Sequence, residues 1–306
     1  MITDASHRVL FERPDLKELT EKYTVVDLHF HSHYSDGFNS IDAIARRARE
    51  LGIGIAITDH NAIEGAVEID NYKDILSVPG IEITSAEGTH ILVYFYDVES
   101  LKVFYHNDVQ PHMGVEVMSS TSLEMEEIVK RARLFETVII FPHPFCGSYA
   151  GILNQYFSEE RLARLFDRID GIEGINAENL NKWNLRGTLL GFNLKKCITG
   201  GSDGHRLVQM GKVVCYAKCN PDRKSILNAI KKRKNKVIGK EIDIIRKFTS
   251  NGVKLRSNIK NYPDLVEKNL KYGYAVFNTR SKAIRANFRR SINDRIKGRQ
   301  RKYRAL

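Results

Sequence analysis

The sequence predicts a parallel α/β fold closed into a barrel, and two observations support this prediction. Short apolar segments typical of buried strands alternate with segments of helical spacing, which is the pattern of strand–helix–strand units in a parallel sheet. Polar, titratable residues follow one apolar strand after another. In a barrel the carboxyl ends of the strands converge on one mouth, where such distant residues can meet. The 306 residues are enough for one large barrel-like domain or two smaller ones.

The individual elements are expected from short apolar runs and from helical periodicity. Strands are expected over 24–29, 53–58, 77–83, 90–96, 137–141, 171–176, 196–199 and 213–217. Helices are expected over 41–51, 123–135, 159–166, 182–194 and 222–233, the last in a position to close the barrel. The helix over 41–51 has the clearest signals, because Ser40 is a favoured N-cap and Gly52 a favoured C-terminal cap. Residues 101–122 have no clear period, which indicates an insertion near the mouth.

The composition is that of a soluble protein, with 42% hydrophobic and 28% charged residues. No apolar run approaches the roughly 18–20 residues needed to span a bilayer. Residues 1–21 are mixed and charged and lack the apolar segment of a secretory signal. Four cysteines are too few and too scattered for a disulfide framework, so we expect a reduced, cytoplasmic compartment. Cys215 and Cys219 are interpreted as core thiols.

Charge is divided unevenly along the chain. Residues 221–306 contain 26 Lys and Arg against 6 Asp and Glu, whereas residues 1–220 contain 22 against 31. A basic tail on an acidic body indicates nucleic acid or an anionic membrane surface as partner, with a solvated tail as the alternative. Residues 280–304 place isoleucines and Phe288 at a spacing of four among Arg and Lys, which predicts a basic amphipathic helix. We expect an N-terminal lead-in (1–23), the barrel (24–235) and a basic, largely helical C-terminal extension (236–306).

The chemistry of the chain is concentrated in its ten histidines and the carboxylates near them. His29 and His31 are two residues apart on an expected strand, so both imidazoles point to one side and can bind one ion. Asp27 can orient one of the rings. Asp36 lies in a Tyr-Ser-Asp-Gly segment, where turn chemistry is its alternative role. Imidazoles and carboxylates are the ligands of zinc, manganese and iron, so this region predicts a metal site.

Two further segments add titratable groups at strand ends. Asp59 and His60 directly follow a fully apolar strand, where such a pair indicates function more often than packing. Glu82 stands alone among apolar residues, and a buried carboxylate is costly unless it is paired or bound to a metal. We interpret Glu82 as a bridge between two ions. Asp59 or His60 can pass a proton near the site, with a ligand or supporting role equally open.

The remaining candidates belong to later strands. His90 begins a strand, and packing in the core is its alternative role. His143 lies between two prolines that present it rigidly. Asp203 and His205 follow a strand through two glycines, which let the backbone approach a ligand closely. Glu178 is a candidate for the rim of the site.

In this order, the motifs resemble those of the PHP family, the polymerase and histidinol phosphatase family of metal-dependent phosphoesterases. The resemblance covers about residues 24–220. The place of Asp36 and the short spacing from Glu82 to His90 are similar to the branch that acts on nucleotides and short RNA. The resemblance implies a distorted (β/α)7, TIM-like barrel with two or three divalent ions, of Mn, Zn or Fe. The implied ligand sets are His29, His31, Glu82 and Asp203; Glu82, His90 and His143; and Asp36, His60 and His205.

The resemblance also implies a reaction. A metal-bridging hydroxide would hydrolyse a phosphate ester of a nucleotide or a nucleic-acid end, as in a phosphatase or an exonuclease, with Asp59, Glu82 and His60 as catalytic residues. One alternative is a phosphatase of a small non-nucleotide phosphomonoester. Another is a non-catalytic module that binds nucleic acid or membrane, although such a scaffold needs no ligand cluster. An amidohydrolase-like barrel would typically use a carboxylated lysine where Glu82 stands.

Overall fold

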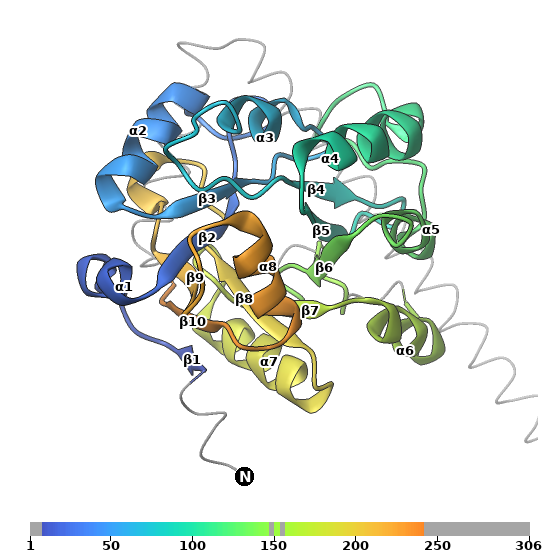
Figure 1. Cartoon of the computed structure of the whole chain (residues 1–306). Helices are drawn as coiled ribbons and strands as arrows, with labels where there is room; N and C mark the ends of the chain where they lie inside the picture. The colour runs from blue at the N-terminus through green and yellow to red at the C-terminus, as the bar shows by residue number, and fades with distance from the viewer. Residues whose placement is uncertain (1–7, 147–149, 154–156, 242–306) are drawn as a thin grey trace, which may run out of the picture.

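The structure, a computed structural model, describes residues 8–146, 150–153 and 157–241 (Figure 1). The strands are β1 (Val9–Leu10), β2 (Thr24–Phe30), β3 (Gly54–Ile57), β4 (Gly80–Thr84), β5 (His90–Phe95), β6 (Thr137–Phe141), β7 (Gly171–Asn176), β8 (Cys197–Gly201), β9 (Val213–Ala217) and β10 (Lys236–Gly239). The α-helices are α1 (Leu16–Lys22), α2 (Ile41–Leu51), α3 (Glu64–Ile69), α4 (Val98–Phe104), α5 (Met125–Ala132), α6 (Glu159–Arg168), α7 (Asn181–Asn193) and α8 (Arg223–Lys231).

The strands form two five-stranded mixed sheets, with helices on the outside of the strands (Figure 1). The first sheet has the order β1-β10-β9-β2-β3 and the second the order β4-β5-β6-β7-β8. Strand β2 runs parallel to β3, and β6, β7 and β8 run parallel to one another. Strand β5 is antiparallel to both β4 and β6, and β9 is antiparallel to both β2 and β10. The expected α/β class is confirmed, but the sheets are mixed rather than parallel.

A closed barrel is not confirmed, because the described strands form no closed sheet. The short connection 85–89 between β4 and β5 explains why the second sheet is mixed, since a parallel pair would need a crossover of a dozen or more residues. The two sheets nevertheless meet along two seams. Phe30 pairs with Gly204 at one seam, and His60 pairs with Glu82 at the other. Both seams lie near the carboxyl ends of β2 and β3.

Local signals placed several elements correctly. Helix α2 begins after Ser40, whose Oγ accepts a hydrogen bond from the Ala43 N–H, and ends at Gly52 in the left-handed conformation, with φ of 67°. Its apolar face is buried, as the spacing predicted. The aperiodic stretch contains the end of α4, the π-helix Tyr105–Val109 and the 3-10 helix Gln110–His112.

The aperiodic stretch 101–122 also contacts the loop that follows β3. The Asn61 side-chain amide donates hydrogen bonds to the carbonyl oxygens of Val117 and Ser119. Because Asn61 follows His60 directly, the stretch lies close to the residues expected at the mouth.

Two boundaries differ from those expected. The lead-in 1–23 contributes β1 and α1, and the extension 236–306 contributes β10. Strands β1 and β10 pair in parallel, with Val9 opposite Val237. The ordered body therefore includes both ends of the described chain, whereas the expected helix over 280–304 lies outside the described residues. No helix among the described residues is long and apolar enough to cross a membrane.

The strands that carry the candidate ligands are fully buried. Every residue of β2, β4 and β5 is buried, including the polar Asp27, His29 and Glu82. A polar group in such a place destabilises the fold unless it has a partner. The partners of these groups therefore define the site.

Candidate metal centre

The nine predicted ligands gather where the carboxyl ends of strands from both sheets meet. Strand β2 provides His29, β4 provides Glu82 and the start of β5 provides His90. The segments after β2, β3, β6 and β8 provide His31 with Asp36, His60, His143, and Asp203 with His205. His90 belongs to this end because β5 runs antiparallel to β4, with His90 opposite Thr84.

Glu82 lies at the centre of the cluster, and its side chain is 1% exposed. Its Oε1 lies 3.0 Å from His90 Nδ1 and 3.2 Å from His143 Nε2. Its Oε2 approaches three other ring nitrogens: His29 Nε2 at 3.2 Å, His60 Nδ1 at 3.2 Å and His31 Nε2 at 3.4 Å. The two oxygens thus belong to separate histidine sets, which is the arrangement required of a carboxylate that bridges two ions.

Four overlapping groups of ligand atoms in this region could each hold an ion, because the atoms of each group lie within 4.8 Å of one another. The groups are His29, His31 and Asp203; His31, Asp36 and His205; His31, His60 and Glu82; and Glu82, His90 and His143. The last group is one of the implied ligand sets. The set implied for Asp36, His60 and His205 is divided, since His31 joins Asp36 and His205 while His60 lies with Glu82.

The donor set fits divalent cations, and the unsatisfied ring nitrogens support this fit. The Nδ1 atoms of His31, His60 and His143 are buried and make no hydrogen bond among the described residues, although carboxylate oxygens lie 3.7 Å from His31 Nδ1 and 3.2 Å from His60 Nδ1. A buried polar atom without a partner costs about 1–3 kcal/mol. A cation bound to these nitrogens would remove that cost, and imidazoles with carboxylates suit zinc, manganese or iron.

Burial disfavours the charged forms of these side chains, whereas attraction between imidazoles and carboxylates favours them. Burial alone would raise the pKa of Glu82, but the imidazoles of His60, His90 and His29 hold that pKa well below its usual range. Burial would lower the pKa of His29, yet Asp203 and Glu82 raise it well above 6.5. His60 behaves differently, because burial dominates and lowers its pKa to about 3. Ionised carboxylates therefore surround imidazoles, of which His60 is neutral at physiological pH.

Asp59, predicted as catalytic, lies outside all four ligand groups. Its Oδ1 accepts hydrogen bonds from the Ser32 N–H at 2.7 Å and the Ser35 hydroxyl at 2.6 Å. Its Oδ2 accepts one from the Ser32 hydroxyl at 2.6 Å. Both oxygens are thus occupied in holding the loop between His31 and Asp36, so the contacts indicate a positioning role. Proton transfer by Asp59 stays a prediction.

Asp27 also holds a loop rather than an imidazole. Its carboxylate accepts hydrogen bonds from the Ser202 N–H at 2.9 Å, from the Ser202 hydroxyl, and from the Gly211 N–H at 2.9 Å. Burial raises the pKa of Asp27 to about 6, although these hydrogen bonds oppose the shift. The glycines before Asp203 likewise serve packing. A Cβ on Gly201 would overlap His29, so this glycine allows β8 to approach β2 closely rather than allowing the backbone to approach a bound substrate.

The sequence reasoning missed Glu173 on β7, which orients two of the ligands. Its Oε1 lies 3.0 Å from His29 Nδ1, and its Oε2 accepts a hydrogen bond of 2.9 Å from the His143 N–H. Asn176 was missed as well. Its side-chain amide donates to Glu173 Oε2 at 2.9 Å and to Asp203 Oδ2 at 3.0 Å. Such partners fix the orientation of metal ligands.

A cavity of about 300 Å³ opens over the cluster. Its walls include Asp36, His60, Glu82, His90, His143, Cys146, Asn176, Glu178, Asn179, Trp183, Asp203 and His205. Glu178, expected at the rim, is among them. His33, which lies between the predicted ligands in the sequence, is exposed and has no place in this wall.

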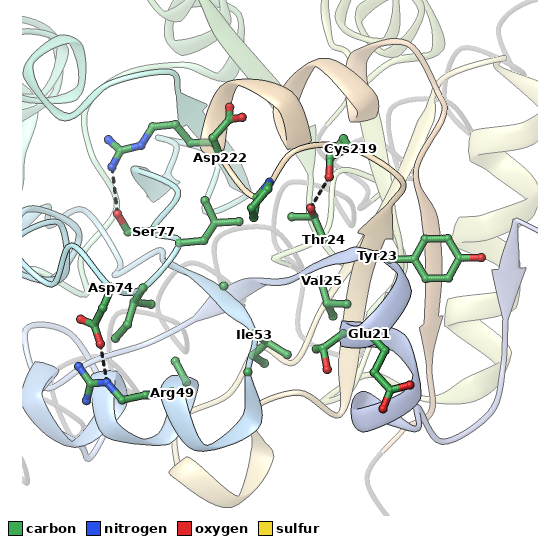
Figure 2. Close-up of a pocket in the computed structure, with 18 of the residues that line it drawn as sticks. Glu21, Tyr23, Thr24, Val25, Arg49, Ile53, Asp74, Ser77, Cys219 and Asp222 are labelled. Carbon is green, nitrogen blue, oxygen red and sulfur yellow. Dashed lines mark hydrogen bonds and ion pairs between the residues drawn. The ribbon is translucent and has the colours of Figure 1, made fainter.

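A larger cavity of about 810 Å³ lies at the opposite, amino ends of β2 and β3 (Figure 2). Its wall contains no histidine, and several of its charged groups form ion pairs within the protein. Arg49 Nε lies 2.6 Å from Asp74 Oδ2, and Thr24 Oγ1 donates a hydrogen bond of 2.8 Å to the Cys219 carbonyl (Figure 2). The smaller cavity, over the histidine cluster, is therefore the candidate active site.

Comparison with known proteins agrees with this site. Residues 27–162 match the family model of the PHP domain, a span that includes every predicted ligand except Asp203 and His205. No curated protein matches the chain.

Among solved structures, one similar chain is a two-domain protein with a predicted PHP-like metal-dependent phosphoesterase from Bacteroides vulgatus. It is 18% identical, with a TM-score of 0.54 over 79% of this chain and 73% of that chain. PsfC from Pseudomonas syringae is 18% identical, with a TM-score of 0.57 over 76% and 98%. The lesion-specific endonuclease EndoQ from Pyrococcus furiosus is 17% identical, with a TM-score of 0.55 over 70% and 57%. These identities establish a likeness of fold.

Proposed function

We propose that this protein is a metal-dependent phosphoesterase that hydrolyses phosphate esters of nucleotides or nucleic-acid ends. Its enzyme class, hydrolases acting on phosphate esters, is that of the PHP domain matched by residues 27–162 and of the neighbours named as phosphoesterase and endonuclease. The observation that carries the proposal is the convergence of nine ligands around the buried carboxylate of Glu82, beneath an open cavity.

Each part of the cluster has a distinct task in this proposal. When bound, two or three divalent ions would supply Lewis-acid activation of water and of the phosphate. Glu82 would join two ligand groups, with His90 and His143 holding one of them. Asn176 would keep Asp203 oriented. Of the two residues predicted to pass a proton, His60 lines the cavity, whereas both oxygens of Asp59 accept hydrogen bonds from the loop after His31.

Two observations favour a nucleotide or nucleic-acid substrate over other esters. The tail from residue 221 onward is strongly basic, with 26 Lys and Arg against 6 Asp and Glu, and such a charge suits a phosphate backbone. The EndoQ fold was also solved with a 27-mer duplex that carries an abasic lesion at its active site. EndoQ is 17% identical to this chain, so the comparison supports a fold that can accept nucleic acid and leaves the substrate of this protein to the proposal.

The direct test is metal analysis of the purified protein combined with a phosphate-release screen. The screen compares mononucleotides, single-stranded oligonucleotides and small sugar or amino-alcohol phosphates, each with Mn, Zn or Fe added. We expect hydrolysis that needs the metal and that is faster for the nucleotide substrates. If the metal-loaded protein releases phosphate from none of these substrates, the non-catalytic binding module is the remaining hypothesis.

A phosphatase of a small phosphomonoester is the second candidate, because a cavity of this size also suits an ester smaller than a nucleotide. About 300 Å³ is at the lower end of the roughly 300–1,000 Å³ typical of ligand pockets. A higher kcat/KM for a base-free sugar phosphate than for any nucleotide would select this function.

The tail supplies an independent test. We expect deletion of residues 280–306 to leave hydrolysis of a small ester nearly unchanged and to weaken binding of a long oligonucleotide. Binding should also lose most of its dependence on salt, because fewer phosphate contacts release fewer counterions. Equal oligonucleotide affinity at low salt, with and without these residues, would contradict a nucleic-acid role for the tail.

A further inference from the structure

We infer that Trp183 is a base-stacking residue of the metal cavity, so that the cavity takes a phosphate ester carrying a flat nucleobase. The inference rests on the proposed function and narrows its substrate class to a nucleotide unit. Trp183 lies in the first turn of α7, is partly exposed and lines the same cavity as His90, His143 and Asp203.

The position of Trp183 is tied to the ligand cluster through its neighbour. Asn184 accepts a hydrogen bond of 3.1 Å from the Asn176 N–H and donates one of 2.9 Å to the Asn176 carbonyl. The Asn176 side chain in turn donates to Asp203 Oδ2 at 3.0 Å. The first turn of α7 is thereby fixed to the end of β7, and the indole is held beside the cluster.

The packing of α7 does not require an indole at this place. Its buried positions are Asn184, Gly187, Thr188 and Gly191, which are small or polar. A Cβ on Gly187 would come 3.2 Å from Pro144, and one on Gly191 would come 2.8 Å from Ile198, so this side of the helix lies close to its neighbours. Trp183 lies outside this set, on the cavity side.

One cation lies beside the indole, and a second lies beside the ring of Phe145. Lys182 Nζ lies 5.2 Å from the centre of the Trp183 ring, and the Arg186 guanidinium lies 4.1 Å from the centre of the Phe145 ring. The Phe145 carbonyl accepts a hydrogen bond of 2.7 Å from the Asn179 side chain, which lines the cavity. Aromatic rings next to exposed cations are the elements with which proteins bind bases and phosphates of single strands.

The size of the cavity and its ligands set the limits of the substrate. About 300 Å³ can hold one nucleotide unit but not a base pair. With the phosphate at the ligand cluster, the base would lie against Trp183 in the wall of the same cavity, and the exposed Lys182 and Arg186 of α7 would add positive charge nearby. The cavity therefore suits the end of a single strand or a mononucleotide.

The binding test uses the fact that the chain contains one tryptophan, so its fluorescence reports this position alone. The protein is titrated with a nucleoside 5′-phosphonate, which resists hydrolysis, with ribose 5-phosphate, which lacks the base, and with phenyl phosphonate. We expect the nucleotide analogue to quench the emission and ribose 5-phosphate to leave it unchanged. Absence of quenching by the nucleotide analogue, or stronger quenching by phenyl phosphonate, would overturn the assignment of a nucleobase.

The kinetic test compares substrates in two variants. Trp183→Leu should reduce the preference for a nucleotide over ribose 5-phosphate, as a ratio of kcat/KM, by roughly 10-fold to 100-fold, mainly through KM. Trp183→Phe should retain most of the preference because it keeps a ring. Leu185→Ala is the matched control on the same helix, since Leu185 is 50% exposed and outside the cavity wall.

The two proposals can fail separately. An unchanged substrate ratio in a folded, active Trp183→Leu variant would overturn the stacking role and leave the phosphoesterase intact. If no ester is hydrolysed, the proposed reaction fails, and the fluorescence titration still decides whether a base binds at Trp183.

Discussion

The two ends of β2 and β3 contain charged groups that are satisfied in different ways. At the amino ends, the larger cavity is lined by exposed groups that pair within the protein, such as Arg49 with Asp74 at 2.6 Å. At the carboxyl ends, Glu82 is buried among imidazoles, and nitrogens such as His143 Nδ1 have no hydrogen-bond partner among the described residues. The comparison shows that the unsatisfied buried groups, and not the size of a hollow, identify the reactive end.

The largest effect should come from Glu82→Gln, which keeps the shape of the side chain and removes its charge. We expect phosphate-ester hydrolysis to fall by at least roughly 100-fold, since even residues that only support metal ligands cost 10–100-fold. Metal content, measured by elemental analysis, should fall by at least one ion per chain.

The matched control for Glu82→Gln is Asp74→Asn at the amino end, where the carboxylate pairs with Arg49. This variant should retain both activity and metal. Near-normal activity of Glu82→Gln would exclude a mechanism that depends on several ions.

The next largest effect should come from metal removal, which should act at the carboxyl end only. The resulting loss of stability should depend on pH. Burial opposes protonation of both rings, but Asp203 and Glu82 raise the pKa of His29 well above 6.5, and Cys146 and Glu82 raise the pKa of His143 likewise. In the metal-free protein these histidines contribute stability that is present below pH 6.5 and is lost as pH rises through their raised pKa values. Metal binds the neutral imidazole, so its stabilisation, about 2.7 kcal/mol at 100 times Kd, grows over the same range.

The measurement is the Tm of chelated and metal-loaded protein as the pH is raised from 6.5, the ordinary pKa of histidine, through the raised pKa values of His29 and His143. The gap between the two should widen as pH rises. A gap that narrows with rising pH would mean that protons do not compete with the ions.

A smaller effect is expected for Asp59→Asn, which weakens the support of the loop between His31 and Asp36. Metal affinity should fall by roughly 10-fold to 100-fold, while the pH dependence of the remaining activity keeps its shape. Titration with metal and a pH–rate profile test this. Loss of one limb of the profile at unchanged metal affinity would instead assign proton transfer to Asp59.

The smallest effect should come from Arg49→Ala at the amino end. The pair with Asp74 is half-exposed on both sides, and such pairs contribute about 0.2–1 kcal/mol. The free energy of unfolding should change by no more than that, and hydrolysis should be unaffected. A large loss of activity would show that the amino end contributes to the reaction and would remove the contrast between the two ends.

The ligands could be predicted from the sequence because each one follows or interrupts an apolar strand. Glu173 carries the same local signal as Glu82, since each stands in a Gly-Ile-Glu run within a buried strand. Glu82 is followed by His90 eight residues later, whereas the partners of Glu173, His29 and His143, are 144 and 30 residues away. Its orienting role depends on tertiary contacts, so it is visible only in the structure.

The closure of the fold was less predictable than its elements. Strand β1 has two residues, too few to show a period, and it pairs with β10 from the other end of the described chain. The basic composition after residue 235 favoured a separate extension, but the Val237 and Ile238 side chains are buried. Here the tertiary pairing with β9 overrides a weak local signal.

Ions bound at the seams between the two sheets would link the sheets to each other. Three of the four ligand groups combine residues of the first sheet or its loops, such as His31, with residues of the second, such as Glu82 or Asp203. Across these edges the backbone makes only isolated bridges. An ion held there would act as a cross-link that makes the two sheets open together, as one cooperative unit in amide exchange. A half-assembled chain would have at most one complete ligand group, that of Glu82, His90 and His143, so hydrolysis that needs several ions would appear only after both halves had folded.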